Sequence, residues 1–252
     1  MRSIRIAFAA ALIMGLFMGT ILPGQASAQA KRTITVATDA TWPPMEMVDA
    51  NKNIVGFDID YMNAIAKEAG FNVVFKNTAW DGIFAGLPAG KYDAVISSVT
   101  ITDERKKELD FSDPYTSVGQ ILVTPKNLKV KGLADMKGKK VGAQIGTTGA
   151  FEIKKVSGVE LKTYDEVGLA FADMAAGRIE GVVCDNPTAI NFALYNKDYK
   201  AKFKVVGKPF TQENYGIAVK KGNKELVDLF NKGIKAVKAK GLDKKFEQKW
   251  LR

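Results

Sequence analysis

A polar stretch near the middle of the chain carries residue types suited to binding a carboxylate. Residues 94–96 are apolar and are followed by Ser97, Ser98 and Thr100, the pattern of a buried strand that ends at a polar cleft. Arg105 comes five residues after Thr100. A guanidinium matches both oxygens of a carboxylate, and its charge does not titrate near neutral pH. The pattern indicates a carboxylate site, although a surface arginine paired with an acid of its own helix would give the same sequence.

Two acids stand directly behind predicted strands. Asp39 follows the strand predicted at 33–38, and Asp185 follows the strand predicted at 179–184. The carboxyl ends of the strands are where open α/β sheets bind ligands. Asp185 could equally be a helix N-cap, because Pro187 follows it.

Two further features suit a cleft. Gly146, Thr147 and Thr148 precede a predicted helix, so their free amides can receive an anion, whereas the glycine and lysine spacing of a nucleotide loop is absent. Trp42 precedes two prolines, which would hold its indole as a wall of the cleft; the alternative places it in the core.

Two series of alternating strands and helices position these residues. Such an order predicts parallel strands with right-handed crossovers. The first series has strands at 33–38, 72–76 and 92–97, a helix from Asp58 to a left-handed cap at Gly70, a short helix over 80–87, and a helix that begins at the N-cap Thr102. The second has strands at 140–145, 159–163 and 179–184, a helix from about 148, and a helix capped by Asp165 and closed by Gly177.

The segments outside the two series predict how the halves are joined. Residues 118–124 are apolar and begin a first crossing, and residues 203–215 read as the return crossing. Residues 215–219 predict a strand that rejoins the first half, followed by two C-terminal helices on either side of Gly241. We therefore expect lobe 1 at 31–116 and 213–252, lobe 2 at 117–212, and hinges near 115–123 and 210–215.

The N-terminus predicts a secretory signal peptide over residues 1–30. Two arginines precede an apolar run at 6–22, and cleavage is expected after Ala28 or Ala30. No second membrane-spanning run follows, so we expect a periplasmic protein without direct membrane insertion.

Composition narrows the class of function. One cysteine excludes an internal disulfide, and the absence of histidine makes a transition-metal site improbable, so we expect no metal and no cofactor. Without the signal peptide the net charge falls from +10 to +8, but the lysines are spread along the chain without interleaved aromatic residues. This pattern favours a solvated surface over a nucleic-acid site.

Five segments in order resemble the bacterial extracellular solute-binding proteins of family 3, the periplasmic receptors of polar amino acid ABC transporters. The glutamine-binding and the lysine/arginine/ornithine-binding members are closest in pattern. The matching segments are 37–46, 55–60, 97–115, 141–148 and 181–187. The resemblance implies an α/β fold of two lobes joined by two hinge crossings, each lobe an open, mostly parallel sheet flanked by helices. It also implies a monomer that closes on one L-amino acid and delivers it to an inner-membrane permease.

The resemblance also implies roles for individual residues. Arg105 would bind the ligand carboxylate, helped by Thr100 and by the backbone amide of Thr148. Asp185 would bind the ammonium, together with the Ser98 carbonyl and the Thr100 hydroxyl. The remaining ligand contacts would come from Asp39, Trp42, Asp58, Trp80, Val99, Gln144 and Thr147.

Departures from the relatives leave the bound side chain open. Cys184 replaces the histidine of the glutamine-binding protein and Ser98 its glycine, and neither change touches the α-carboxylate or ammonium contacts. Gln144 replaces a lysine that balances the acid equivalent to Asp39, so we expect a cationic ligand, arginine or lysine, ahead of glutamine. A competing class, the cyclohexadienyl dehydratases, resembles these receptors; such an enzyme needs a general acid, and Glu46 is the only glutamate near a cleft loop. We expect no enzyme activity.

Overall fold

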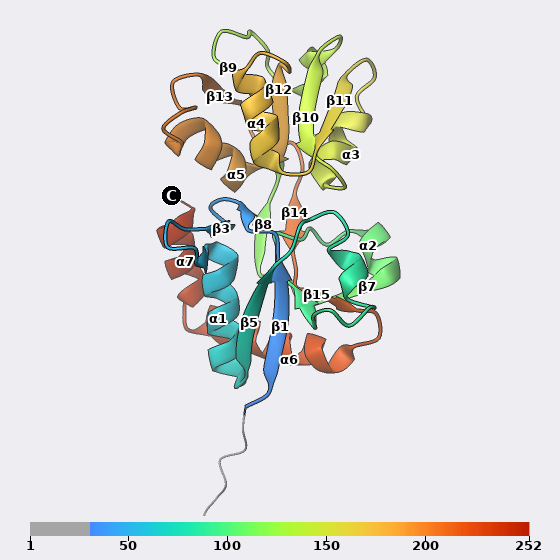
Figure 1. Cartoon of the computed structure of the whole chain (residues 1–252), viewed down its shortest axis with the longest axis vertical. Coiled ribbons are helices and arrows are strands. Elements are labelled where there is room, and N and C mark those ends of the chain that lie inside the picture. Colours follow the sequence, from blue (N-terminus) through green and yellow to red (C-terminus); the bar gives the residue numbers. More distant parts are fainter. Residues whose placement is uncertain (1–30, 252) are drawn as a thin grey trace, which may run out of the picture. The chain divides into compact units, whose positions relative to one another are not determined.

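The computed structural model describes residues 31–251, which fold around two five-stranded sheets with helices on their faces (Figure 1). The predicted signal peptide lies outside the described residues. Among residues 31–251, no helix has the length and apolar character needed to cross a membrane.

The first sheet is built from both ends of the chain. Its strand order is β5 (Asn72–Asn77), β1 (Thr33–Thr38), β6 (Ala94–Val95), β15 (Ala218–Lys220) and β7 (Leu109–Phe111). As predicted, β1 pairs in parallel with β5 and β6, whereas β15 runs antiparallel to β6 and β7. The helices of this half are α1 (Phe57–Ala69), α2 (Asp103–Glu108), α6 (Lys224–Ala239) and α7 (Leu242–Trp250).

The second sheet uses only the middle of the chain. Its order is β11 (Glu160–Tyr164), β10 (Lys140–Gln144), β12 (Gly181–Asp185), β9 (Gln120–Pro125) and β13 (Phe203–Val206). The first three strands are parallel, and β9 and β13 are antiparallel. The helices here are α3 (Thr148–Lys154), α4 (Val167–Ala175), α5 (Asn186–Ile190), a π-helical turn η3 (Asn191–Tyr195) and a short 3₁₀ turn η2 (Leu133–Met136).

Two segments connect the halves. β8 (Thr116–Val118) and β14 (Glu213–Tyr215) pair antiparallel as a separate two-stranded ribbon, which lies between the two sheets in Figure 1. A small sheet of β2 (Thr41–Trp42), β3 (Glu46–Val48) and β4 (Ile54–Val55) follows β1. This small sheet brings the double-proline segment back over the end of β1.

Local signals in the sequence explain several helix ends. Gly70 has a φ of 88° and its N–H bonds to the Ala66 carbonyl, so the predicted left-handed cap of α1 is confirmed. Thr102 caps α2 as predicted, because its side chain accepts a 3.1 Å hydrogen bond from the Arg105 N–H. This cap fixes Arg105 in the first turn of a short helix beside the end of β6.

Three predicted elements differ from the structure. Asp165 does not cap α4: Glu166 holds the N-cap position, and the Asp165 carbonyl instead accepts a bond from Gln144. The strand predicted at 215–219 is divided into the end of β14 and the strand β15. Between them, the Ile217 carbonyl accepts from the Ser112 N–H and the Ile217 N–H donates to Ser112 Oγ. The helix predicted over 80–87 is only a 3₁₀ turn, η1 (Phe84–Gly86).

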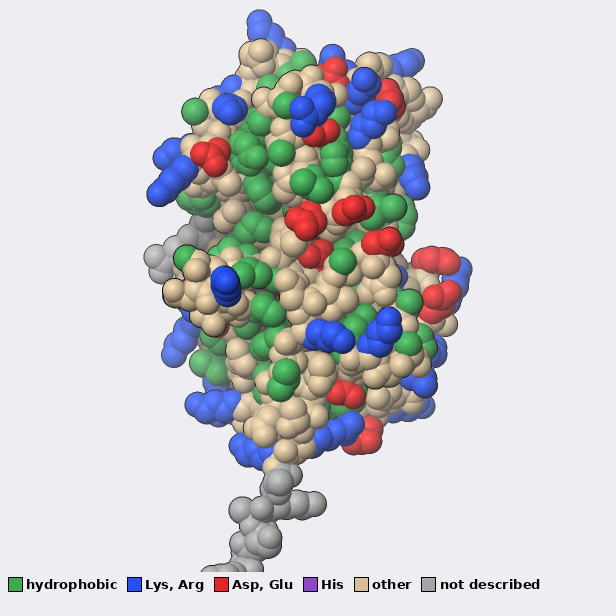
Figure 2. Space-filling view, in the orientation of Figure 1, with side chains coloured by type: hydrophobic (Ala, Val, Ile, Leu, Met, Phe, Trp, Pro, Cys, Tyr) green, Lys and Arg blue, Asp and Glu red, His purple; other side chains and the backbone are tan. Residues whose placement is uncertain are grey.

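Charged side chains are distributed as the sequence indicated. Figure 2 shows lysine and arginine side chains scattered over this face rather than gathered in one continuous patch. Such a distribution is typical of a solvated surface.

Candidate functional site

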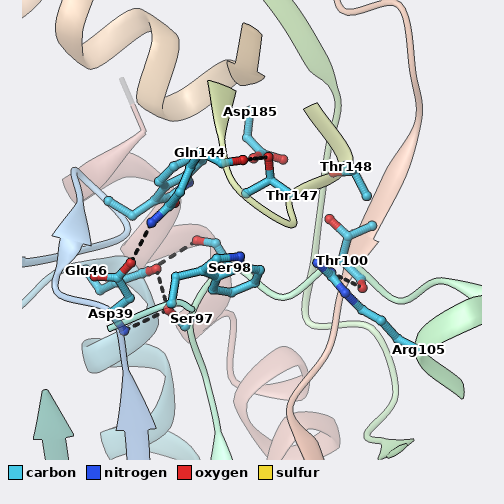
Figure 3. Close-up of a pocket in the computed structure, with 12 residues that line it drawn as sticks. Asp39, Glu46, Ser97, Ser98, Thr100, Arg105, Gln144, Thr147, Thr148 and Asp185 are labelled. Atoms are coloured by element: carbon cyan, nitrogen blue, oxygen red, sulfur yellow. Dashed lines mark hydrogen bonds between the residues drawn. The ribbon is translucent and has the colours of Figure 1, made fainter. Parts of the chain in front are cut away.

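One cavity brings together ten of the twelve residues predicted to bind ligand (Figure 3). Strand ends and loops of both sheets contribute to it. The lining residues are Asp39, Trp42, Glu46, Trp80, Ser97, Ser98, Thr100, Arg105, Gln144, Thr147, Thr148 and Asp185.

Two predicted residues do not line this cavity. Val99 is fully buried in an apolar cluster that includes Val95 and Leu109, and it does not reach the cavity. Asp58 lies one layer deeper, where its Oδ2 accepts bonds from the Ser98 N–H (2.7 Å) and the Tyr115 hydroxyl (2.8 Å). Asp58 therefore supports the wall of the cavity instead of forming its surface.

The ends of β1 and β6 form one side of the site. The Asp39 N–H donates to Ser97 Oγ at 2.9 Å, which holds the two strand ends together. Ser98 has a φ of 50°, an uncommon conformation for a residue other than glycine. Strained backbone of this kind clusters at binding sites, where surrounding contacts hold it in place.

Glu46 is a lining residue that the ligand-binding prediction omitted. It is fully buried at the start of β3, and its two carboxylate oxygens accept bonds from Ser97 Oγ (3.1 Å) and Ser98 Oγ (3.2 Å). Gly56 permits this position: its φ is 143°, and a Cβ there would lie 2.1 Å from the Met45 carbonyl oxygen. The glycine before Asp58 was thus a usable sign that the chain at residues 45–46 packs against the start of α1.

Asp39, Glu46 and Asp58 form a buried acidic cluster. Burial raises the pKa of Asp39, and burial raises the pKa of Asp58 to about 6. The pKa of Glu46 lies well above its ordinary value, first because of burial and then because of the neighbouring Asp58 and Asp39 charges. Among residues 31–251, no lysine or arginine forms an ion pair with these three acids.

Aromatic rings flank the acidic cluster. Trp42 and Trp80 are 5% and 8% exposed, and both line the cavity. Trp42 also belongs to a large apolar cluster that takes residues from both halves. It is therefore both a wall of the cavity and a residue of the core. Figure 3 shows Asp39 and Glu46 of the acidic cluster at one end of the site and Arg105 at the other.

Arg105 lies at the opposite end of the cavity. Its Nη1 donates to the Thr100 carbonyl at 2.8 Å, and its Nη2 donates across to the Gly146 carbonyl at 3.2 Å. The guanidinium carbon is 5.3 Å from the centre of the Trp80 ring. Burial lowers the pKa of Arg105 to about 10, so the side chain stays charged at neutral pH.

Asp185 ends β12 and faces the same end of the cavity. It holds the N-cap position of α5, but its side chain makes no capping bond; its Oδ1 instead accepts from Gln120 Nε2 at 2.9 Å. Burial, and then the charge of Glu213, raise the pKa of Asp185 to about 7. The geometry favours the cavity interpretation over the simple N-cap.

The loop after β10 supplies the rest of the second half's contribution. Thr147 caps α3 by accepting from the Ala150 N–H, and its hydroxyl donates to the Gln144 carbonyl at 2.7 Å. Gln144 Nε2 donates to Asp39 Oδ2 at 2.9 Å and to the Asp165 carbonyl at 2.7 Å. Gln144 therefore links the two halves directly above the acidic cluster.

Two α/β halves joined by a two-stranded ribbon, with a polar cavity between them, define a solute-binding protein. The chain belongs to the bacterial extracellular solute-binding proteins, family 3, whose sequence profile matches residues 34–252. The predicted family and the predicted two-lobed fold are confirmed. Members of this family bind amino acids and work with ABC transporters.

The relatives differ in the amino acid that they are named for. A probable histidine-binding protein of Neisseria gonorrhoeae is 38% identical over 210 residues, which cover 82% of this chain and 78% of that protein. The ABC transporter arginine-binding protein 1 of Escherichia coli K12 is 37% identical over 227 residues, 89% of this chain and 93% of its own. These relatives are transport binding proteins.

A solved relative gives the same picture in three dimensions. An ancestral arginine-binding protein bound to arginine is 45% identical, with a TM-score of 0.83 over 88% of this chain and 99% of that chain. An ancestral arginine-binding protein bound to glutamine matches with 45% identity and a TM-score of 0.82 over 87% of this chain and 98% of that chain. The two solved relatives thus hold a cationic and a neutral amino acid.

Proposed function

We propose that this protein is the periplasmic receptor of an ABC transporter for a cationic L-amino acid, arginine or lysine. The observation that carries the proposal is the buried acidic cluster of Asp39, Glu46 and Asp58, to which no lysine or arginine of residues 31–251 is paired. Buried charge is costly unless it is paired, so a cationic group of the ligand would be stabilised here.

The other end of the cavity suits the α-carboxylate and the ammonium. Two N–H groups of the Arg105 guanidinium donate to backbone carbonyls, and the other N–H groups of its five can donate to a carboxylate. Asp185 offers an acid to the ammonium, with the Ser98 carbonyl and the Thr100 hydroxyl beside it. The Thr148 amide completes the carboxylate contacts.

The walls suit an alkyl stem with a cationic end. Trp42 and Trp80 give apolar faces between the two polar ends, and a guanidinium or ammonium group can stack on such rings.

The same proposal assigns the lobes and the location. Lobe 1 is 31–116 with 213–252, lobe 2 is 117–212, and the lobes close about 115–123 and 210–215; the pairing of β8 with β14 supports this hinge. A signal peptide at 1–30 directs the protein to the periplasm, where it works as a monomer with an inner-membrane permease.

A glutamine receptor is the alternative within the same class. Gln144 favours it, because the Gln144 amide already donates to Asp39 and could pair with a ligand amide. An acid facing a neutral ligand would stay partly uncompensated, whereas a cation forms a charge-assisted bond of about 1.5–3 kcal/mol. We therefore expect a preference for arginine or lysine of about tenfold or more.

An enzyme is the alternative of another class. The raised pKa of Glu46 keeps a proton available at the cavity surface, which a general acid requires. The intact Asp185, with Glu213 nearby, would repel a prephenate-like dicarboxylate that has no ammonium. A turnover assay with prephenate and arogenate separates the classes, because the receptor forms no product.

Competition calorimetry against the common L-amino acids tests the ligand. The expected result is that arginine or lysine displaces glutamine at equal concentration. If glutamine displaces both cations, the charge argument is wrong and Gln144 sets the specificity.

A further inference from the structure

Glu213 lies on the hinge strand β14, yet it holds hydroxyl groups from both halves of the molecule. Its Oε2 accepts bonds from Thr100 Oγ1 and from Thr148 Oγ1, each at 2.8 Å. Thr100 follows the end of β6 in the first half, and Thr148 is the first residue of α3 in the second. One carboxylate oxygen therefore bridges the cavity-lining residues of the two halves.

The surroundings of Glu213 hold this carboxylate in place. Gln120 Nε2 approaches the same oxygen at 3.4 Å, and Thr211 Oγ1 donates to the other oxygen at 2.8 Å. The two short bonds from Thr100 and Thr148 match the two lone pairs of the Oε2 oxygen, and Gln120 adds a weaker third contact. Hydrogen bonds to an ionised acceptor are roughly twice as strong as neutral ones.

We propose that Glu213 is a positioning residue that clasps the two lobes closed over the bound amino acid. The inference rests on the proposed receptor function. Glu213 does not line the cavity, and it acts through the hydroxyls of Thr100 and Thr148, which do.

The clasp also sets the polarity of these two hydroxyls. Each has one proton, and in both residues that proton is donated to Glu213. The Thr148 hydroxyl oxygen also accepts a 3.0 Å bond from Gln120 Nε2, whereas the lone pairs of the Thr100 hydroxyl oxygen remain for a ligand. Thr100 is thereby prepared to accept from the ammonium instead of donating to the carboxylate.

Opening of the lobes must break the Thr148–Glu213 bond. Glu213 would stay with Thr100, because the strand β14 also carries Tyr215, the bridge partner of Thr100. Thr148 would move away with α3. Ligand release requires this separation. Loss of the clasp should therefore act mainly on the dissociation rate.

The experiment is a double-mutant cycle with L-arginine as the probe. Glu213→Gln keeps the shape and removes the charge, and Thr148→Val keeps the shape and removes the hydroxyl. Each single variant should raise Kd about tenfold, mostly through a faster dissociation rate measured by stopped flow. The double variant should be little worse than either single variant, because both remove the same bond.

Two further variants separate this role from a general effect on the hinge. Ser117→Ala removes the 2.7 Å bond from Ser117 Oγ to Asn214 Oδ1, which joins the two hinge strands without touching the cavity, and it should leave Kd and the dissociation rate unchanged. Thr148→Ser, unlike Thr148→Val, has a hydroxyl at this position and should therefore show the wild-type dissociation rate. This rescue keeps the test valid if the Glu213 variant does not fold.

The outcomes are distinguishable. Glu213→Gln with wild-type Kd and dissociation rate, additive effects in the cycle, or no effect of Thr148→Val overturns the clasp alone. Wild-type protein that binds no amino acid overturns the proposed function, and the clasp with it. If glutamine is the ligand instead of arginine, the same cycle is run with glutamine, because the clasp acts at the shared α-carbon end.

Discussion

Affinity for arginine should rise with pH, and it should rise more steeply than affinity for glutamine. Burial raises the pKa of Asp58 to about 6, and Asp39 and Glu46 are shifted in the same direction. A cationic side chain favours the ionised form of this acidic cluster, so binding must release the proton that the free protein holds. Binding of a neutral amide does not require the acidic cluster to release this proton.

The size of the effect follows from the pKa of Asp58. If Asp58 is ionised in the complex, the fraction of free protein that is ready for the cation grows about tenfold between about pH 5 and about pH 7. The guanidinium of the ligand does not titrate in this range. Kd for arginine should therefore fall about tenfold from this group alone.

Asp185 titrates in the same pH range, so its contribution to the pH dependence of Kd must be separated from that of Asp58. Its pKa of about 7 gives both ligands a pH dependence, because both present an ammonium to it. The ratio of the two Kd values cancels this shared contribution. The ratio of Kd for glutamine to Kd for arginine should rise about tenfold from about pH 5 to about pH 7.

Calorimetric titration in buffers of different ionisation enthalpy measures the effect and counts the released protons. Asp58→Asn should flatten the ratio while the Asp185-dependent trend remains for both ligands. A ratio that does not change with pH would refute the idea that the acidic cluster binds a cation.

Three further outcomes follow from the geometry. Arg105→Ala should lose about 2–5 kcal/mol of binding free energy without unfolding, because a desolvated carboxylate is left unpaired. Arg105→Lys should recover only part of this free energy. Near-native affinity of the alanine variant would show that Arg105 is not part of the site. The radius of gyration by X-ray scattering should fall when saturating ligand closes the lobes. An unchanged scattering curve with proven binding would contradict the hinge model. Thr102→Ala should lower the free energy of unfolding in urea by about 1 kcal/mol through loss of the α2 cap, and an unchanged midpoint would contradict the role of that cap.

The parts of the fold that follow local rules were predictable from the sequence. β1 was predicted with its observed bounds, because an alternating apolar strand ends at an acid. Gly70 marks a helix end because glycine tolerates a positive φ, and Thr102 marks one through its side-chain hydrogen bond. The α-carbon end of the site follows from the same rules. Ser98 and Asp185 lie at or just after the ends of strands of the two sheets, and open α/β sheets bind ligands at the carboxyl ends of their strands.

The divided strand shows where local rules are insufficient. Residues 215–219 read as one apolar run, but a Cβ at Gly216 would lie 2.7 Å from the Ile101 side chain, and Ile217 bonds to Ser112 instead of a strand neighbour. These contacts come from segments more than a hundred residues away. Tertiary packing therefore decides where β14 ends and β15 begins.

The side-chain end of the site depends on packing of the same kind. Glu46 lies in an ordinary proline-rich segment, and nothing in its immediate sequence says that it is buried. Its position follows from Gly56, which lets the backbone at Met45 approach α1 and brings Glu46 beside Asp58. The same packing that buries Glu46 raises its pKa and gathers three carboxyl groups at one end of the cavity. Ser98, Arg105 and Asp185, proposed to bind the constant part of an amino acid, stand close to strand ends or caps that local sequence marks. Glu46 and Asp58, proposed to select its side chain, are placed by long-range packing, which is why ligand class was easier to predict than ligand identity.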